Sequence, residues 1–311
     1  MPLEVIYVVR HGFRSNWLVN PTTGDYKASI PSPTGISSDP ALTAHGVDQA
    51  RELGAHLMTV DPPIDAVYSS PYYRCLQTIT PFVDLKVQDL ERRQAEGGST
   101  PLQGEAARLI RPETGIAEWY GSAPFDHPTP ASGEVLKGMF SRYDERYRTA
   151  VIPAVKGETV DELYARLANA VGAIIDQCDA EGHRAIILCS HAAPIIALGR
   201  VLTGKVPSSV DVEDFDAFTC GLSVFRRRQA SPDNGPEFWK DGRGVRGGWD
   251  CAVNSDCSFL SKGEERGWRF SGDESFHKTE TTSQDDAGIA LGVVVEGRGK
   301  QSRSTPGAHH L

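Results

Sequence analysis

The chain has 311 residues, of which 39% are hydrophobic, which suits one large domain or two small ones with a real core. Its formal net charge of −9 at pH 7 argues against a general nucleic-acid binder, so any anion site must be a local cluster of cations. The N-terminus carries no basic region followed by a long apolar run, and the apolar run 287–295 is too short to cross a bilayer, so we expect neither a secretory signal nor a membrane contact.

Strands and helices alternate in the N-terminal part. Residues 4–9 are short and β-branched, which predicts a buried strand, and residues 20–41, rich in Pro, Ser, Thr, Gly and Asp, predict a loop. Thr43 is a candidate N-cap for an amphipathic helix over 44–58. Residues 64–70 predict a second buried strand, and a helix begins near Pro71.

The middle of the chain continues the alternation after a gap. Residues 91–134 predict an excursion with little regular structure. A long helix follows, with acidic residues in its first turn from residue 158 and Gly182 at its end. Residues 184–190 and 221–227 predict further strands, with a small apolar helix at 192–203 between them. This order predicts an α/β fold, a three-layer sandwich around a mostly parallel central sheet.

The C-terminal part differs in composition and is rich in Gly, Ser and Trp. We expect a domain over 1–228 and an extension over 229–270 that packs on it, because Trp239, Trp249 and Trp268 are side chains that usually dock. The composition of residues 271–311 predicts a disordered tail.

Cationic and imidazole side chains follow three of the predicted strands. Arg10 and His11 end the first strand, with Arg14 shortly after them. Arg74 lies one turn into the helix after the second strand, and His191 follows the third. Because ligands of such sheets bind beyond the carboxyl ends of the strands, we expect these side chains to meet at one edge. Buried cations need a partner, so they predict an anion pocket.

This pocket suits phosphoryl transfer. Arginine guanidinium groups match phosphate oxygens in a bidentate manner, and nearby arginines disfavour the imidazolium form, which keeps His11 available as a nucleophile. A phosphoryl group held by cations opposite a neutral imidazole is set up for in-line transfer to nitrogen. Hydrolysis of the phosphohistidine by water completes a two-step covalent cycle.

Five sequence blocks in the right order resemble the histidine phosphatase superfamily, also called the phosphoglycerate mutase-like family. The agreement covers residues 4–228, and the blocks are "RHG" (10–12), "LTAHGVDQA" (42–50), "SSPYYRCLQT" (69–78), "GETVDELYARL" (157–167) and "ILCSH" (187–191). The resemblance implies the phosphoglycerate mutase-like fold and a catalytic domain over 1–228. It also implies that His11 is the phosphorylated nucleophile, that Arg10 and Arg74 bind phosphate, and that His191 hydrogen-bonds it.

The resemblance further implies a general acid between Arg74 and the long helix. The best match is Glu118 in "GIAEWYG" (115–121), whose apolar and aromatic neighbours predict a raised pKa and hence the ability to protonate a leaving alkoxide. Glu113 and Glu105 are less well framed by aromatic residues.

Within the superfamily, "RHGFRSNWL" (10–18) resembles the phosphatase domain of the fungal tau subunit of the RNA polymerase III factor TFIIIC and the stand-alone fungal relatives of that domain. More distantly, it resembles the ubiquitin-associated and SH3-domain phosphatases. In that branch Arg14 joins the phosphate pocket, although an ion pair with Asp39 is its alternative role. Mutases of the family carry other residues at Phe13, Arg14 and Trp119, which favours a phosphatase over a mutase.

We therefore expect a phosphomonoester hydrolase of the metal-independent histidine acid-type, acting on a phosphorylated small molecule or a phosphoprotein. The alternative is a catalytically weak, TFIIIC tau-like partner-binding module in an RNA polymerase III transcription complex. A phosphoglycerate mutase-type phosphotransferase is a weaker alternative. No His, Cys and Asp cluster has metal-ligand spacing, so we expect no metal and no cofactor.

Partners and location are predicted from the same features. The C-terminal extension is a candidate surface for a protein partner, and we expect no direct contact with nucleic acid or membrane. The six cysteines form no CxxC pair and fit reduced thiols, which predicts a cytoplasmic or nuclear location.

Overall fold

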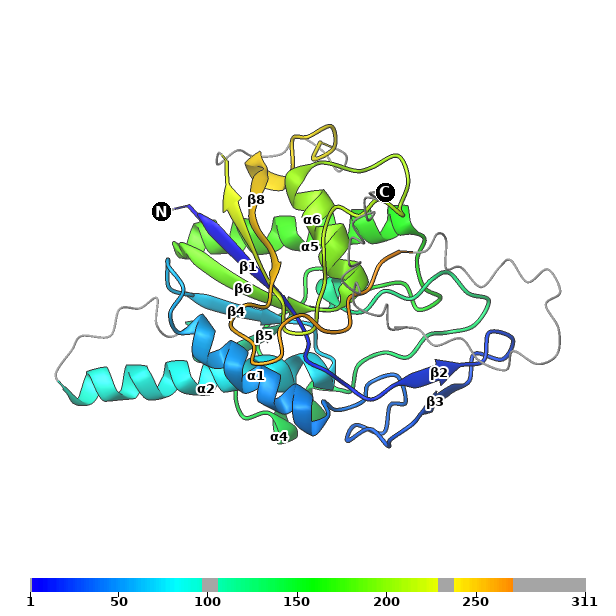
Figure 1. Ribbon diagram of the computed structural model, residues 1–311, viewed down its shortest axis with the longest axis horizontal. Coiled ribbons are helices and arrows are strands. Elements are labelled where there is room, and N and C mark those ends of the chain that lie inside the picture. Colours follow the sequence, from blue (N-terminus) through cyan, green and yellow to red (C-terminus); the bar gives the residue numbers. More distant parts are fainter. Residues whose placement is uncertain (1, 97–105, 229–237, 271–311) are drawn as a thin grey trace, which may run out of the picture.

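The protein is described by a computed structural model that covers residues 2–96, 106–228 and 238–270 (Figure 1). In these residues the central sheet has six strands in the order β5-β4-β6-β1-β7-β8. Strands β5, β4, β6 and β1 run parallel, whereas β7 is antiparallel to both β1 and β8. The strand bounds are β1 (Val5–Arg10), β4 (Ala66–Ser69), β5 (Ile110–Pro112), β6 (Ala185–Ser190), β7 (Leu222–Arg227) and β8 (Trp249–Asp256). The predicted mostly parallel sheet is confirmed.

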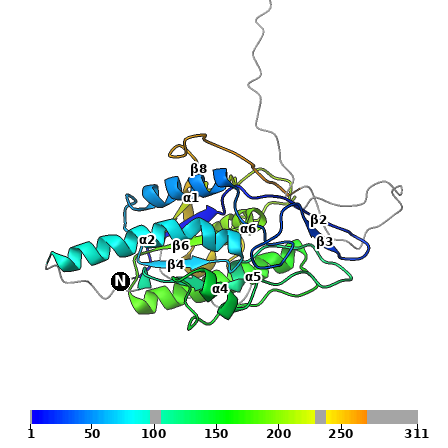
Figure 2. The ribbon, with the colours of Figure 1, turned by 90° about the horizontal axis from the view of Figure 1, so that it is seen from below.

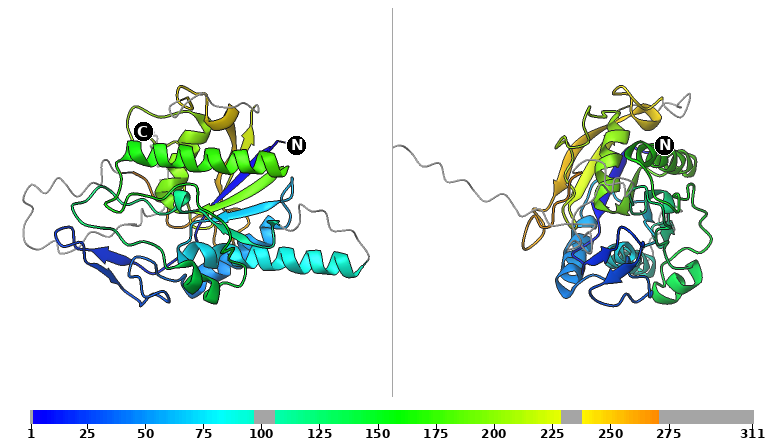
Figure 3. Two further views of the ribbon diagram at one scale, coloured as in Figure 1. Left: turned by 180° about the vertical axis from the view of Figure 1, so that it is seen from behind. Right: turned by 90° about the vertical axis from the view of Figure 1, so that its right-hand side faces the viewer.

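Helices cover both faces of the sheet. On one face lie α1 (Ala44–Leu57), α2 (Tyr73–Ala95) and the short α4 (Gly133–Met139), with α1 and α2 side by side (Figure 2). On the other lie α5 (Val160–Glu181) and α6 (Ala192–Thr203) (Figure 3). Ile6 and Val8 of β1 pack into the core under α5 and α6, while Val5, Tyr7 and Val9 face the core under α1 and α2. The three-layer sandwich is thus confirmed, and its central strand is buried on both faces.

Local sequence signals explain the helix ends. The side chain of Thr43 accepts a hydrogen bond from the Gly46 amide at the start of α1. Thr159 and Glu162 form a reciprocal capping box at the start of α5, and Gly182 ends that helix at a φ of 75°. These caps fix the ends of one helix on each face of the sheet.

Short elements were missed by the sequence analysis. The region predicted as a loop over 20–41 contains β3 (Tyr26–Ala28), which pairs with β2 (Trp17–Val19) in a separate two-stranded ribbon. The region predicted to have little regular structure over 91–134 contains the edge strand β5 and the single turn η1 (Thr114–Ile116). Helix α2 also runs into it as far as Ala95, and α4 begins at its end. Elements of three residues are too short to show a periodic pattern.

The sheet continues past the boundary that we expected after Arg228. After the single turn η2 (Val245–Gly247), β8 pairs with β7 as the edge strand, so residues 249–256 are part of the sheet itself. Trp239 and Trp249 are buried in the core under α5 and α6. The tail expected over 271–311 lies outside the described residues. None of the helices in the described ranges is both long and apolar enough to cross a membrane.

Candidate active site

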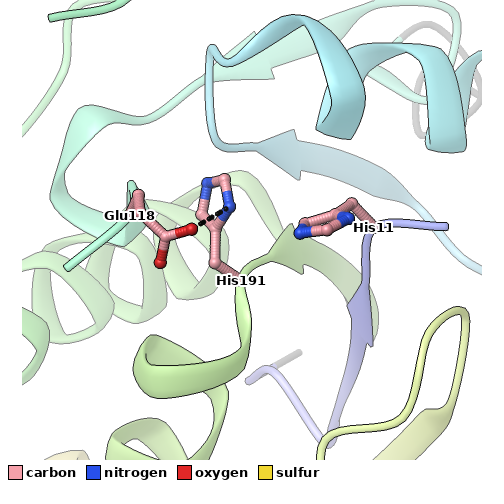
Figure 4. Close-up of side chains that lie close together, drawn as sticks. All are labelled: His11, Glu118 and His191. Atoms are coloured by element: carbon pink, nitrogen blue, oxygen red, sulfur yellow. Dashed lines mark ion pairs between the residues drawn. The ribbon is translucent and has the colours of Figure 1, made fainter. Parts of the chain in front are cut away.

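The ends of β1 and β6 bring two histidines together. Arg10 and Ser190 are register partners in these neighbouring parallel strands, so the residues that follow them, His11 and His191, lie side by side. Their ring centroids are 5.4 Å apart. Glu118 approaches His191 from the loop after η1 (Figure 4).

All the predicted cations reach the same place. Arg10, Arg14 and Arg74 are each at most 5% exposed, and His11 and His191 at most 1%. A cavity of about 30 Å³ opens beside Arg10, His11 and Arg14; the rest of its lining is Trp17, Glu118, Trp119, Tyr120, Ala192, Ala193 and Trp268. Arg74 and His191 do not line this cavity but contact Glu118 at its wall. The structure therefore places the predicted set at one edge of the sheet.

The three arginines are held by their terminal nitrogens. Arg10 Nη1 donates to the carbonyls of Ala217 (2.6 Å) and Arg266, and Arg74 Nη1 donates to the Ser38 carbonyl (3.0 Å). Arg14 Nη1 donates to the Ser15 carbonyl at 2.9 Å. The Nε atoms of all three arginines are buried and have no hydrogen-bond partner among the described residues. Buried unpaired donors cost free energy, so an anion with several acceptor oxygens suits this site.

The alternative role considered for Arg14 is wrong. Asp39 pairs instead with Arg74, at 3.2 Å from Nη1. Arg14 stacks on Trp17, with its guanidinium carbon 3.8 Å from the ring centroid. Burial, followed by the charge of Arg74, holds the pKa of Arg14 well below its usual value.

His11 is presented with a free ring nitrogen. Its Nδ1 lies 2.8 Å from the Gly12 carbonyl, and because a carbonyl only accepts, Nδ1 carries the proton and Nε2 keeps its lone pair. Burial and then the charges of Arg74 and Arg10 lower the pKa of His11 well below its usual value. The imidazole is therefore neutral, as a nitrogen nucleophile requires.

His191 connects the arginines to Glu118. Its Nε2 lies 2.7 Å from Ser70 Oγ, and its Nδ1 lies 3.0 Å from Arg74 Nη2 and 3.3 Å from Glu118 Oε2. The ring thus has polar neighbours at both nitrogens, which fixes its orientation at the pocket wall.

The pKa expected for Glu118 is wrong in direction. Burial does raise it, but attraction and hydrogen bonding to His191, with the charges of Arg74 and Arg14, lower the pKa of Glu118 overall. Because these cations lower its pKa, Glu118 is ionised in the ligand-free protein. The apolar residues that flank Glu118 along the chain give no sign of these cations.

Arg166 of α5 fixes the loop that carries Glu118. Its Nη1 donates to the carbonyls of Gly115 and Ala117, both at 3.0 Å, and its Nε pairs with Glu158 at 2.8 Å. The other candidate acid, Glu113, is fully buried and accepts hydrogen bonds from Tyr147, Thr149 and nearby amides, which is a structural role. Glu105 lies outside the described residues.

His11, Glu118 and His191 offer ligand atoms that all lie within 4.8 Å of one another. Sequence spacing did not reveal this group because its members come from three distant segments. Such a group has the donor types of a transition-metal site. Three arginines share the same space, however, and their positive charge opposes a cation there.

Two contributors to the site were missed altogether. Trp268 lines the cavity, and the Arg266 carbonyl accepts a hydrogen bond from Arg10. Both lie far beyond His191, where the last recognised block ends. Their only local signal was that Trp268 is a large aromatic residue in a Gly-rich stretch.

Known proteins with similar sequences include a histidine phosphatase family and two curated relatives. The family model of the histidine phosphatase superfamily (branch 1) matches residues 6–149. The transcription factor tau 55 kDa subunit of Saccharomyces cerevisiae is 32% identical over 289 residues, which cover 87% of this chain and 59% of that protein. The ecdysteroid-phosphate phosphatase of Drosophila melanogaster is 28% identical over 184 residues, which cover 58% of this chain and 22% of that protein.

A solved structure shares the fold. The ecdysone phosphate phosphatase from Bombyx mori, in complex with tungstate, superposes with a TM-score of 0.53 at 20% identity, covering 81% of this chain and 93% of that one. The chain thus spans 59% of the length of the yeast relative and 22% of the length of the Drosophila one.

Proposed function

The chain belongs to the histidine phosphatase superfamily, and from this premise we propose that it hydrolyses phosphomonoesters through a phosphohistidine on His11. One observation carries the proposal: a neutral His11 with a free Nε2 lies among three buried arginines whose Nε–H groups have no partner in the described residues. This arrangement pairs a nucleophile with a cradle for the phosphoryl oxygens.

In the first step the ester phosphate binds to Arg10, Arg14, Arg74 and His191. His11 Nε2 attacks phosphorus in line, an N–P bond forms and the bond from phosphorus to the ester oxygen breaks. The leaving oxygen takes a proton from Glu118 and departs as an alcohol. In the second step water attacks the phosphohistidine, Glu118 takes a proton from that water, the N–P bond breaks, and inorganic phosphate and neutral His11 are formed.

Glu118 must be protonated to act first as an acid. It is ionised in the ligand-free protein because cations surround it. The negative charge of a bound phosphate ester offsets those cations, which raises the pKa of Glu118 at the moment the acid is needed. A metal has no role in this scheme, because the arginines supply the positive charge.

A turnover assay over a panel of alkyl, aryl, sugar and peptide phosphomonoesters tests the proposal, with the release of inorganic phosphate as the readout. The protein should release phosphate from some of them, and His11→Ala should release none. Transfer of phosphate to a second hydroxyl in place of water would favour the phosphotransferase alternative. Equal phosphate release by His11→Ala would overturn the proposal.

The 32% identity to the tau 55 kDa subunit over 87% of this chain favours a second candidate function. In this role the chain is a tau-like partner-binding module, placed in the nucleus by its complex. The test is reconstitution with yeast factor tau assembled without its 55 kDa subunit, followed by sedimentation. Wild type and His11→Ala should enter the complex equally, since the role does not need catalysis. Failure of both to enter would remove this candidate.

A further inference from the structure

A short C-terminal segment closes one side of the cavity. We call residues 264–270 the cover segment; it comes after β8 and turns back toward the catalytic loops. Near its start the Glu265 carboxylate pairs with His45 and accepts a hydrogen bond from Gln49 at 2.8 Å. At its end Phe270 is buried, with its ring centroid 5.4 Å from that of Trp119. The segment is therefore anchored at both ends.

Arg266 ties the middle of the cover segment to the phosphate pocket. Its carbonyl accepts a hydrogen bond from Arg10 Nη1, and its own Nη1 donates to the Arg14 carbonyl at 2.8 Å. Its guanidinium carbon lies 3.6 Å from the ring centroid of Phe13. Arg266 therefore contacts both arginines of the "RHGFR" stretch, Arg10 through its carbonyl and Arg14 through its side chain. These contacts hold the residues that follow Arg266, including Trp268, beside the pocket.

Trp268 differs from the other large aromatic residues at the cavity. Trp17, Trp119 and Tyr120 are 2%, 6% and 7% exposed, so they form its inner walls. Trp268 is only partly buried and stacks edge-on against Phe270, with centroids 4.9 Å apart. Among the cavity-lining Trp and Tyr side chains in the described residues, Trp268 therefore offers the most surface to an incoming molecule.

The size of the cavity limits what fits beside Trp268. Its 30 Å³ is room for about two or three water molecules, since one water needs roughly 10–15 Å³ measured in this way. A phosphoryl group fills such a space, so the alcohol part of an ester must extend past the partly exposed indole. An indole held there by Phe270 leaves less room for a large alcohol group than for a small one, so it discriminates by size.

We propose that Trp268 is a specificity-determining residue that favours phosphomonoesters of small alcohols over those of large ones, and that Arg266 is the positioning residue that keeps it in place. The inference rests on the proposed function of the pocket. It assigns a role at the site to a segment that lies beyond every recognised catalytic block.

Non-hydrolysable phosphonates test this without any need for turnover. The probes are inorganic phosphate, methylphosphonate and 1-naphthylmethylphosphonate, and calorimetry measures their affinities. For wild type, methylphosphonate should bind far better than the naphthyl probe. Trp268→Ala should shift that ratio toward the naphthyl probe by about tenfold or more, and Trp268→Phe by less. Trp239→Phe, at a tryptophan buried elsewhere in the core, is the matched control and should leave the ratio unchanged.

Arg266→Met tests the positioning role. It should shift the ratio in the same direction as Trp268→Ala, and Arg266→Lys should restore part of the discrimination, since an ammonium can still donate to a carbonyl. Thermal unfolding of each variant separates a local change from misfolding, and Trp268→Phe keeps a ring against Phe270 if the alanine variant fails to fold.

The outcomes are distinguishable. If inorganic phosphate binds but the ratio of the two phosphonates is the same in wild type and both Trp268 variants, the inference is wrong and the proposed function stands. If the naphthyl probe binds Trp268→Ala more weakly than wild type, the indole attracts large groups and the size limit is wrong. If wild type binds no inorganic phosphate, the proposed function and this inference both fail.

Discussion

Glu118 Oε2 accepts a hydrogen bond from Arg74 Nη2 at 3.0 Å. In the free protein this contact gives Arg74 a counter-ion, and the charge of Arg74 adds to the larger effect of His191 in lowering the pKa of Glu118. A phosphate ester competes with Glu118 for the same guanidinium, because arginine matches phosphate in a bidentate manner. Substrate binding and protonation of the proposed acid are therefore coupled in part through Arg74.

The first prediction concerns this acid. Glu118→Gln should slow hydrolysis of alkyl phosphates by about 10²-fold or more, because an alkoxide leaves poorly without a proton. It should slow p-nitrophenyl phosphate much less, since nitrophenolate needs no proton. Steady-state kcat/KM on both substrates makes the comparison. Equal losses on the two substrates would assign Glu118 a positional role and require another acid.

The second prediction concerns the covalent intermediate. Brief incubation with a ³²P-labelled substrate followed by quenching should leave label on the protein, because His11 Nε2 is free and neutral. The label should be lost in hot acid and kept in base, as expected of a phosphoramidate. His11→Ala should carry no label. Label that survives acid, or persists in His11→Ala, contradicts the assignment.

The third prediction concerns metals. Although His11, Glu118 and His191 are close enough to share an ion, Arg10, Arg14 and Arg74 already provide the positive charge. Dialysis against EDTA should therefore leave kcat/KM unchanged, and vanadate should inhibit because it adopts the trigonal bipyramid of in-line transfer. Loss of activity in EDTA with recovery in a divalent metal would show that the histidines and Glu118 hold an ion.

The fourth prediction concerns acid stability. Burial and neighbouring arginines lower the pKa of His11 below 6.5, so as pH falls past about 6.5 the unfolded chain takes up a proton that folded His11 does not. Folding stability must therefore decline toward acid, by about 1.4 kcal/mol per pH unit for one such group. His127 and His183 act in the same direction because burial lowers their pKa values too.

His11→Gln removes the contribution of His11 to the loss of folding stability at acid pH. Urea unfolding between pH 7 and pH 5 should show a shallower loss of stability for His11→Gln than for wild type, with the two curves diverging below about pH 6.5. Parallel curves over this interval would mean that His11 is protonated in the folded protein.

The fifth prediction separates the role of the cover segment from that of the residues beyond Gly272. A chain that stops after Gly272 should fold and turn over substrate like the full chain. A chain that stops after Gly263 keeps β8 but loses the carbonyl that accepts from Arg10, and its kcat/KM should fall roughly ten- to hundredfold, as expected for a lost hydrogen bond to a charged group. Full activity in the shorter chain would exclude the cover segment from the site.

The features that could be predicted from the sequence are those that local patterns control. Thr43 and Gly182 marked helix ends because caps are local. The rule that ligands bind at the carboxyl ends of parallel strands grouped Arg10, Arg74 and His191 correctly. Strands β3 and β5 were missed because three residues show no periodicity.

Properties that depend on distant neighbours could not be predicted in the same way. The direction of the Glu118 pKa depends on His191 and Arg74, which the residues flanking Glu118 do not reveal. Arg266 and Trp268 contribute to the site because the chain after β8 runs back to the pocket, and no sequence motif indicates this path.

The central position of β1 in the sheet determines how late during synthesis this strand can pair with its neighbours. The central strand β1 leaves the ribosome well before its two partners, β6 and β7, which begin only at Ala185 and Leu222. Until they emerge, both edges of β1 lack the strands with which they pair, and the Arg10 guanidinium lacks the carbonyl of residue 266 for longer still. Such a chain folds slowly, because many of its contacts join distant residues. Ribosome-bound fragments that end before Ala185 should therefore depend on chaperones to stay soluble.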